Sequence, residues 1–331
     1  MPLTSEELAK IHETNTGHAG INSLFSKAHS MDWDLDRDVN WDVEIAREDP
    51  VMNTEWTVYG HTPSFKGLAP EVQAHLTRSE LNRFLVNLQL GESVALDVCA
   101  KLARLSERED HRNHAVAQAM DEARHHAAYV RFLHMLGDAD WDGLDPFTVR
   151  LFDHLLESED ETELVMTEQF FLESLAMPAF ESLAEHAKHP LLRDIASLIR
   201  RDESRHMGFG VLYAKQLQEK MTEDERLEFA DRWVRRVLKA VQRGPDAEAL
   251  TAERLREVGA DDPAGLAARL QSELAEVRAA EQEEATAGRR VPHLLASCRR
   301  AGLLAPELLE PLGLSENPLV QGAVRGSLPL A

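Results

Sequence analysis

Apolar residues recur at helical spacing through the middle of the chain. The first such segment begins at Pro70, and proline is favoured in the first turn of a helix. From there apolar side chains return every three or four residues, at Leu81, Phe84, Leu85, Leu88, Val94, Ala95, Val98 and Leu102. The pattern ends near a charged cluster at residues 106–110. It therefore predicts one long helix over about 70–106.

Later segments show the same helical period. They predict further helices over about 110–136, 160–187, 190–220 and 222–243. Gly137 is expected to end the first of these, and Pro190 to open the third. Pro178 is expected to kink the second, because proline removes a backbone donor and crowds the preceding turn. No segment alternates convincingly with period two, so we predict an all-α fold.

The two ends of the chain are less regular. Residues 1–68 contain turn residues and an acidic, Trp-bearing stretch at 31–41 without a sustained helical period, and we interpret them as an arm wrapping the core. Residues 141–146 carry turn chemistry between two predicted helices. Residues 244–331 are rich in Ala, Glu, Arg and Leu, which predicts smaller helices. The expected division is an N-terminal arm (1–68), a helical bundle (69–243) and a C-terminal helical extension (244–331).

Composition limits the partners of the chain. With a formal net charge of −22, nucleic acid and anionic membrane surfaces are poor partners. No apolar run approaches the roughly 20 residues that span a bilayer, and the first residues resemble neither a secretory signal nor a transit peptide. We therefore expect a cytoplasmic protein with no nucleic-acid or membrane partner. Cys99 and Cys298 lie far apart, so a metal site would use nitrogen and oxygen ligands.

A five-residue motif occurs twice on different predicted helices. Asp121-Glu-Ala-Arg-His125 recurs as Asp202-Glu-Ser-Arg-His206, with four of five positions identical. A single Glu-x-x-His is most often a solvated helix face, but each copy here places a carboxylate and an imidazole on one face, where both can reach a common centre. These donors suit iron or manganese. The motif predicts as metal ligands Glu122, His125, Glu203 and His206.

Such a centre needs two further carboxylates from neighbouring helices, as in di-iron helical bundles. Glu92 is flanked by apolar residues and lies 30 residues before Glu122, with the predicted turn midway between them. An antiparallel pair of helices would therefore bring Glu92 opposite Glu122.

The carboxylate partner of Glu203 has two candidates. Glu168 and Glu173 are about 140° apart on an α-helix, so only one is expected to point inward. Hairpin symmetry about the turn before Pro190 favours Glu173. Apolar helical neighbours favour Glu168, because a carboxylate among apolar side chains needs a metal or another partner. We predict Glu168, with Glu173 as the alternative.

The repeated Asp-Glu-x-Arg-His resembles the signature of the ferritin-like di-iron carboxylate oxygenases and oxidases. It is similar to that of multicomponent monooxygenase hydroxylases and ribonucleotide-reductase-like oxidases, and covers about residues 75–220. The resemblance implies a ferritin-like four-helix bundle with additional helices and terminal extensions. In those families the Asp before each Glu accepts a hydrogen bond from a ligand histidine, and the Arg pairs with that Asp. This implies supporting roles for Asp121, Arg124, Asp202 and Arg205.

The resemblance also implies a reaction. We expect two iron ions, with a manganese–iron pair as the alternative, to use O2 and an external electron donor to hydroxylate, N-oxygenate or desaturate a small organic substrate. An electron-transfer protein and a second copy of the chain, forming a homodimer, are the expected partners. The rival hypotheses are a ferroxidase or iron-binding ferritin-like protein, and a non-catalytic helical protein with buried ion pairs.

Two positions bear on the type of reaction. Di-iron arylamine N-oxygenases carry an extra histidine ligand four residues before the last glutamate, where this chain has Ile199; this argues against N-oxygenation. Tyr129 occupies the position of the radical tyrosine of the reductase small subunit. We expect Tyr129 to be a buried structural residue, because a tyrosine in a core commonly satisfies its hydroxyl there.

Overall fold

Helices make up the regular structure of the part of the chain that the computed structural model describes. That part comprises residues 17–46, 49–137, 146–243, 252–257, 259–287 and 292–326. Within it there is no strand, only an isolated bridge between Met52 and Ala187. The all-α prediction is confirmed. Residues 1–16 of the predicted arm, residues 244–251 of the predicted extension and most of the predicted turn at 141–146 lie outside the described residues.

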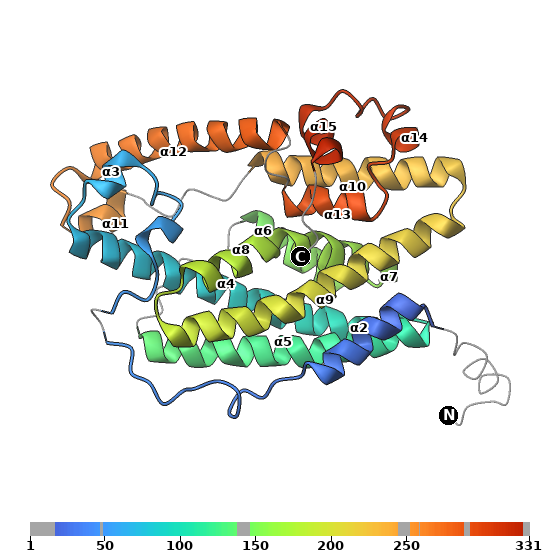
Figure 1. The fold of residues 1–331 in the computed structure, drawn as a ribbon, viewed down its shortest axis with the longest axis horizontal. Helices are drawn as coiled ribbons and strands as arrows, with labels where there is room; N and C mark the ends of the chain where they lie inside the picture. The colour runs from blue at the N-terminus through green and yellow to red at the C-terminus, as the bar shows by residue number, and fades with distance from the viewer. Residues whose placement is uncertain are drawn as a thin grey trace.

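Two helical hairpins form the bundle. Helix α4 (Pro70–Leu105) packs along α5 (Glu109–Leu136), and α8 (Glu173–His186) packs on α9 (Pro190–Lys220), as Figure 1 shows. The helix ends agree with the prediction. Gly137 follows α5 with φ 77°, a left-handed conformation that favours glycine.

The third bundle helix is built from three consecutive pieces. These are α7 (Glu161–Val165), a π-helical segment η2 (Met166–Leu172) and α8. Pro178, where we expect a kink, lies inside α8, and the π-turn before α8 is a separate distortion of this helix. It arises because η2 closes its turn over five residues instead of four, and the backbone N–H of Glu173 donates to the carbonyl of Glu168.

Part of the predicted arm is helical. Helix α2 (Ala19–Ser30) lies across α5 and α9 (Figure 1). Only Ile21 of this helix is buried, and this helix is not among those predicted from the sequence. After α2 the chain is irregular through residues 31–46, as predicted, and then forms two short turns, η1 (Thr54–Trp56) and α3 (Pro63–Lys66).

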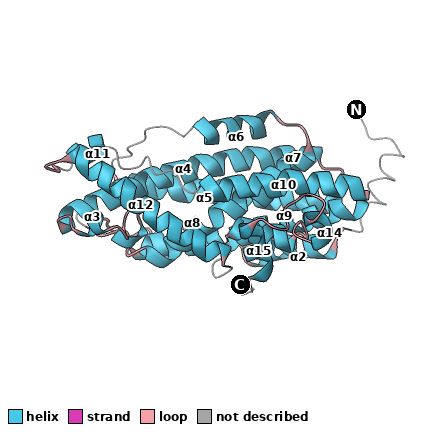
Figure 2. Cartoon of the chain, turned by 90° about the horizontal axis from the view of Figure 1, so that it is seen from above, coloured by secondary structure: helices cyan, strands magenta, loops and turns pink. Residues whose placement is uncertain are grey.

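The remaining helices surround the bundle. Figure 2 shows α6 beside α4, and Figure 1 shows most of the others on the side of the bundle away from α2. They are α6 (Pro146–Glu157), α10 (Glu223–Arg243), α11 (Ala252–Glu257), α12 (Pro263–Thr286), α13 (His293–Arg300), α14 (Pro306–Leu309) and α15 (Pro318–Arg325). Among the described helices, none is both long and apolar enough to cross a bilayer.

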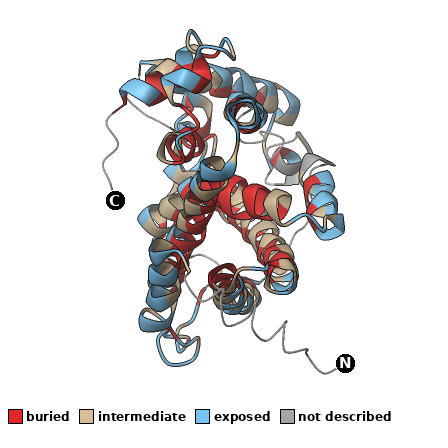
Figure 3. Cartoon of the chain, turned by 90° about the vertical axis from the view of Figure 1, so that its right-hand side faces the viewer, coloured by how far each residue is buried: buried red, intermediate tan, exposed pale blue. Residues whose placement is uncertain are grey.

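Burial is concentrated where the bundle helices face one another (Figure 3). One apolar cluster contains Tyr129 and Ile199, and another contains Phe170, Phe209 and Trp233. Between these apolar regions the bundle buries a set of charged side chains. This contrast is the main feature of the interior, because ionised groups are seldom buried unless they are paired or bind a metal.

Candidate metal centre

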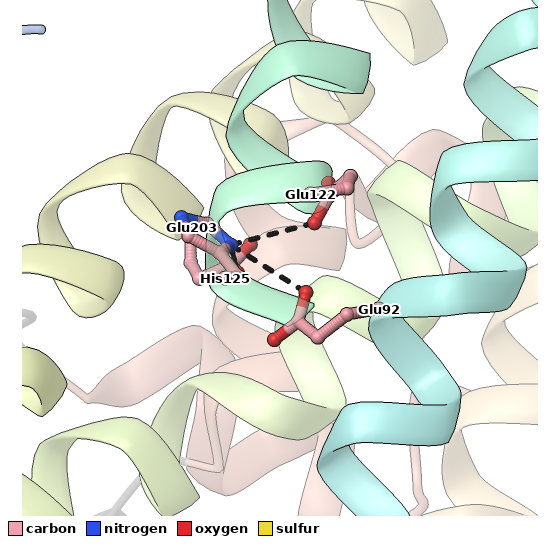
Figure 4. A group of neighbouring side chains, drawn as sticks. All are labelled: Glu92, Glu122, His125 and Glu203. Carbon is pink, nitrogen blue, oxygen red and sulfur yellow. Dashed lines mark ion pairs between the residues drawn. The ribbon is translucent and has the colours of Figure 1, made fainter. Parts of the chain in front are cut away.

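Each helix of the bundle contributes a buried carboxylate to its centre. Figure 4 shows the carboxylates of α4, α5 and α9 converging on the imidazole of His125. The central side chains, all at most 6% exposed, are Glu92 on α4, Glu122 and His125 on α5, Glu173 at the start of α8, and Glu203 and His206 on α9.

These six side chains form two overlapping groups. Position 1 comprises Glu92, Glu122, His125 and Glu203, and position 2 comprises Glu122, Glu173, Glu203 and His206. In each group the candidate ligand atoms all lie within 4.8 Å of one another. Because Glu122 and Glu203 belong to both groups, the six side chains would hold two metal ions close together.

Both histidines direct Nδ1 at the carboxylates. His125 Nδ1 lies 3.0 Å from Glu203 and 3.4 Å from both Glu92 and Glu122. His206 Nδ1 lies 2.8 Å from Glu203, 3.2 Å from Glu122 and 3.5 Å from Glu173. In each ring, therefore, Nδ1 is the nitrogen available to a metal.

The opposite ring nitrogens face aspartates. His125 Nε2 lies 3.3 Å from Asp202, and His206 Nε2 lies 3.2 Å from Asp121. Arg205 donates to both aspartates, at 2.8 Å and 2.9 Å, and Arg124 lies 3.2 Å from Asp121. Hydrogen bonds of this kind fix the ring orientation of ligand histidines. The contacts implied by the resemblance are thus present in the structure.

The electrostatics of the centre are unfavourable without a cation. Burial raises the pKa values of Glu92 and Glu173 well above their usual range. Burial acts to lower the pKa of His125, but Glu203 and Glu92 outweigh it and raise that pKa well above normal. Two divalent cations would remove this conflict, because they stabilise carboxylates and accept neutral imidazole as a ligand.

The residues present fit two iron ions. Glu122 Oε2 and His125 Nδ1 are buried. Although both lie close to oppositely charged groups, neither makes a hydrogen bond of suitable geometry within the described structure. Such unsatisfied buried atoms are expected where a metal binds. Four carboxylates and two imidazoles on a helical bundle are the donor set of di-iron and di-manganese proteins.

The π-helical segment determines how the two candidate glutamates lie. Glu168 and Glu173 are 5% and 6% exposed, so the expectation that only one would point inward is wrong. A π-turn closes after five residues and brings both onto the same face. Glu173 belongs to position 2, whereas Glu168, which we predicted, belongs to neither group. Burial, with added repulsion from Glu122 and Glu203, raises the pKa of Glu168 to about 8.

The structure adds two residues that sequence reasoning missed. Gln118 donates to Glu122 at 2.9 Å and to Glu173 at 3.2 Å. It lies one helical turn before Glu122, and this spacing could have identified it. Trp33 donates its indole N–H to Asp202 at 2.7 Å. Nothing in the sequence connects Trp33, in the arm, with the metal motifs.

Two residues near position 1 are fully buried. The hydroxyl of Tyr129 has no hydrogen-bond partner among the described residues, so the expected reason for its burial is wrong. Ile199 packs in the same apolar cluster and presents no nitrogen to the centre.

Comparison with known families identifies one match over most of the chain. The family described as p-aminobenzoate N-oxygenase AurF matches residues 14–279, a range that contains both metal positions and Trp33. No curated protein matches the chain.

Proposed function

The chain belongs to the AurF family of p-aminobenzoate N-oxygenases and is a di-iron oxygenase of a small organic substrate, and we propose that this substrate is an aromatic amine oxidised at nitrogen. The family match carries this proposal, because it spans the whole of the buried centre. The argument against N-oxygenation from Ile199 is outweighed, since the chain lies within the family despite that residue.

We further propose six protein ligands for the two iron ions. They are Glu92, Glu122, His125, Glu173, Glu203 and His206. Geometry supports Glu173 over Glu168, because its carboxylate lies with the other position 2 ligand atoms. The supporting residues proposed are Asp121, Arg124, Asp202, Arg205 and Gln118, whose hydrogen bonds reach the ligands directly or through an aspartate.

The proposed reaction requires electrons from outside the chain. Conversion of an amine to a hydroxylamine consumes one O2, two electrons and two protons, and releases one water. When bound, the two iron ions supply the activation of O2. A manganese–iron pair remains the alternative, and an electron-transfer protein is the proposed donor.

The protein's own groups hold the ligands and exclude water. Asp121 and Asp202 accept the N–H groups of His206 and His125, which keeps each Nδ1 turned to the centre. Gln118 holds Glu122 and Glu173 in place from one side. Fully buried Phe170 and Phe171 belong to the apolar cluster at the position 2 end, and this packing excludes water from a reactive site.

We also propose that the protein is cytoplasmic and that two copies of the chain form a homodimer. Val116 and Met120 lie one turn apart on α5 and are 54% and 64% exposed, so a second copy packed here would cover two apolar side chains. Light scattering coupled to size exclusion should give twice the mass of the chain. A monomer at micromolar concentration would refute the dimer alone.

The proposed reaction is tested with iron-loaded, chemically reduced protein, an arylamine such as p-aminobenzoate, and 18O2. Mass spectrometry should find hydroxylamine, nitroso or nitro products whose oxygen derives from O2. p-Hydroxybenzoate, which lacks the amine, is the matched control and should not be consumed. Oxygen inserted only at carbon, or ferric mineral accumulating without product, would contradict N-oxygenation.

A further inference from the structure

The two metal positions have similar ligands but different surroundings. Near position 2, Asp121 Oδ2 accepts from His206 and from the charged guanidinium of Arg205. Near position 1, Asp202 Oδ2 accepts from His125 and from the neutral indole of Trp33. The repeated motif would place Arg124 on Asp202 as Arg205 lies on Asp121.

The arm accounts for this difference. Arg124 pairs instead with Asp32 at 2.8 Å, and its guanidinium lies 5.1 Å from the centre of the Trp33 ring. The indole is also nearly parallel to the His125 ring, with an interplanar angle of 16° and centroids 6.5 Å apart. Trp33 is only 3% exposed. The arm therefore inserts one buried side chain beside a single ligand histidine.

We propose that Trp33 is a positioning residue that makes the two metal positions unequal, acting on His125 through Asp202. This inference rests on the proposed metal centre and extends it. The indole N–H of Trp33 donates to Asp202 Oδ2, the same oxygen that accepts from the position 1 histidine, His125.

The physical basis is the charge left on the aspartate oxygen. A charge-assisted hydrogen bond from a guanidinium is stronger than one from a neutral N–H, so it draws more charge from Asp121 Oδ2 than Trp33 draws from Asp202 Oδ2. The other oxygen of Asp202, Oδ1, accepts a hydrogen bond from Arg205 at 2.8 Å and lies 3.6 Å from Arg201. A stronger acceptor makes the histidine it holds a better metal donor. His125 should therefore donate more strongly than His206.

The test compares two tryptophans of the same arm. Trp33→Phe keeps an aromatic ring and removes the N–H. Trp41→Phe is the control, because Trp41 likewise packs against an arginine, Arg131, but donates to the carbonyl of Leu35 and has no link to the centre. Metal-free proteins are titrated with Co2+, and the titrations of His125→Ala and His206→Ala assign each binding step to a position. Iron-loaded proteins give the reduction potentials.

In Trp33→Phe, affinity at position 1 should rise by up to roughly tenfold, because Asp202 Oδ2 then serves His125 alone and holds it with more charge, while position 2 stays within about twofold. The potential assigned to position 1 should fall for the same reason. Trp41→Phe should change neither property. Weaker or unchanged binding at position 1, or an equal change at both positions, would overturn the inference.

A substitute variant and the number of Co2+ ions bound by wild type separate the role of Trp33 from the existence of the metal centre. If Trp33→Phe does not fold, Trp33→Leu, which also lacks the N–H, is titrated instead; tighter binding at position 1 alone supports the inference, and unchanged or weaker binding there overturns it. Wild-type protein that binds fewer than two Co2+ ions would refute the metal centre itself. Two bound ions with an unaltered Trp33→Phe would refute the role of Trp33 alone.

Discussion

At the scale of single residues, Glu168 and Glu173 show how backbone geometry decides between two similar side chains. Apolar neighbours favoured Glu168, and that argument correctly identified a buried carboxylate, since Glu168 is 5% exposed. Burial alone did not distinguish Glu173, the proposed ligand, from Glu168, which belongs to neither group. Glu173 joins position 2 because the π-turn rotates it inward without rotating Glu168 outward.

Replacing each glutamate separately should therefore give different results. Glu173→Gln should reduce bound iron from two ions towards one per chain, because position 2 loses a charged ligand. Glu168→Gln should retain two. Elemental analysis of the two variants, prepared in parallel, measures the difference. Loss of iron from Glu168→Gln with Glu173→Gln unaffected would restore the original sequence-based assignment.

Glu168 should also give the metal-free protein a distinct pH dependence. Its pKa is raised from 4.5 to about 8 by burial, so between these values the folded state holds a proton that the unfolded state has released. Stability therefore falls as pH rises through this window, by up to about 1.4 kcal/mol per pH unit from this group. Denaturant unfolding of wild type and Glu168→Gln should show the variant gaining relative stability from pH 5 to 8. A constant difference would contradict the assignment.

At the scale of elements, the close packing of η2 against α9 positions Glu173. A Cβ at Gly210 would lie 2.5 Å from the backbone nitrogen of Phe170 and 2.6 Å from the carbonyl carbon of Gln169. No side chain fits there unless a backbone moves. Gly210 therefore lets α9 approach the π-turn that turns Glu173 towards His206.

Gly210→Ala should destabilise the protein by about 1–3 kcal/mol, as overpacking does, and weaken metal binding at position 2. Gly208→Ala is the control on the same helix. A Cβ there would meet Leu24 at 3.7 Å, an ordinary contact, and alanine should add about 0.5–1 kcal/mol of helix stability. Thermal unfolding and Co2+ titration measure both effects. Equal behaviour of the two variants would show that the close approach is unimportant.

At the scale of the whole molecule, the sequence predicts the helices and candidate ligands that follow a repeating pattern. It does not predict the residues that a distant segment of the chain brings to the centre. The apolar period predicted α4, α5, α9 and α10 because each presents a long buried stripe. Local spacing could not predict the π-turn, since one extra residue in a turn leaves no strong signal in composition. Trp33 was equally hidden, because its partner Asp202 is 169 residues away in the sequence.

We propose that the bundle binds two iron ions, with Glu122 and Glu203 among the ligands of both. Elemental analysis of protein expressed with iron, together with the variant Glu122→Ala, measures this binding. Wild type should contain two iron ions per chain. Glu122→Ala should contain at most one, because this carboxylate belongs to both positions. Wild-type protein without stoichiometric iron or manganese would show that the bundle is not a metal centre.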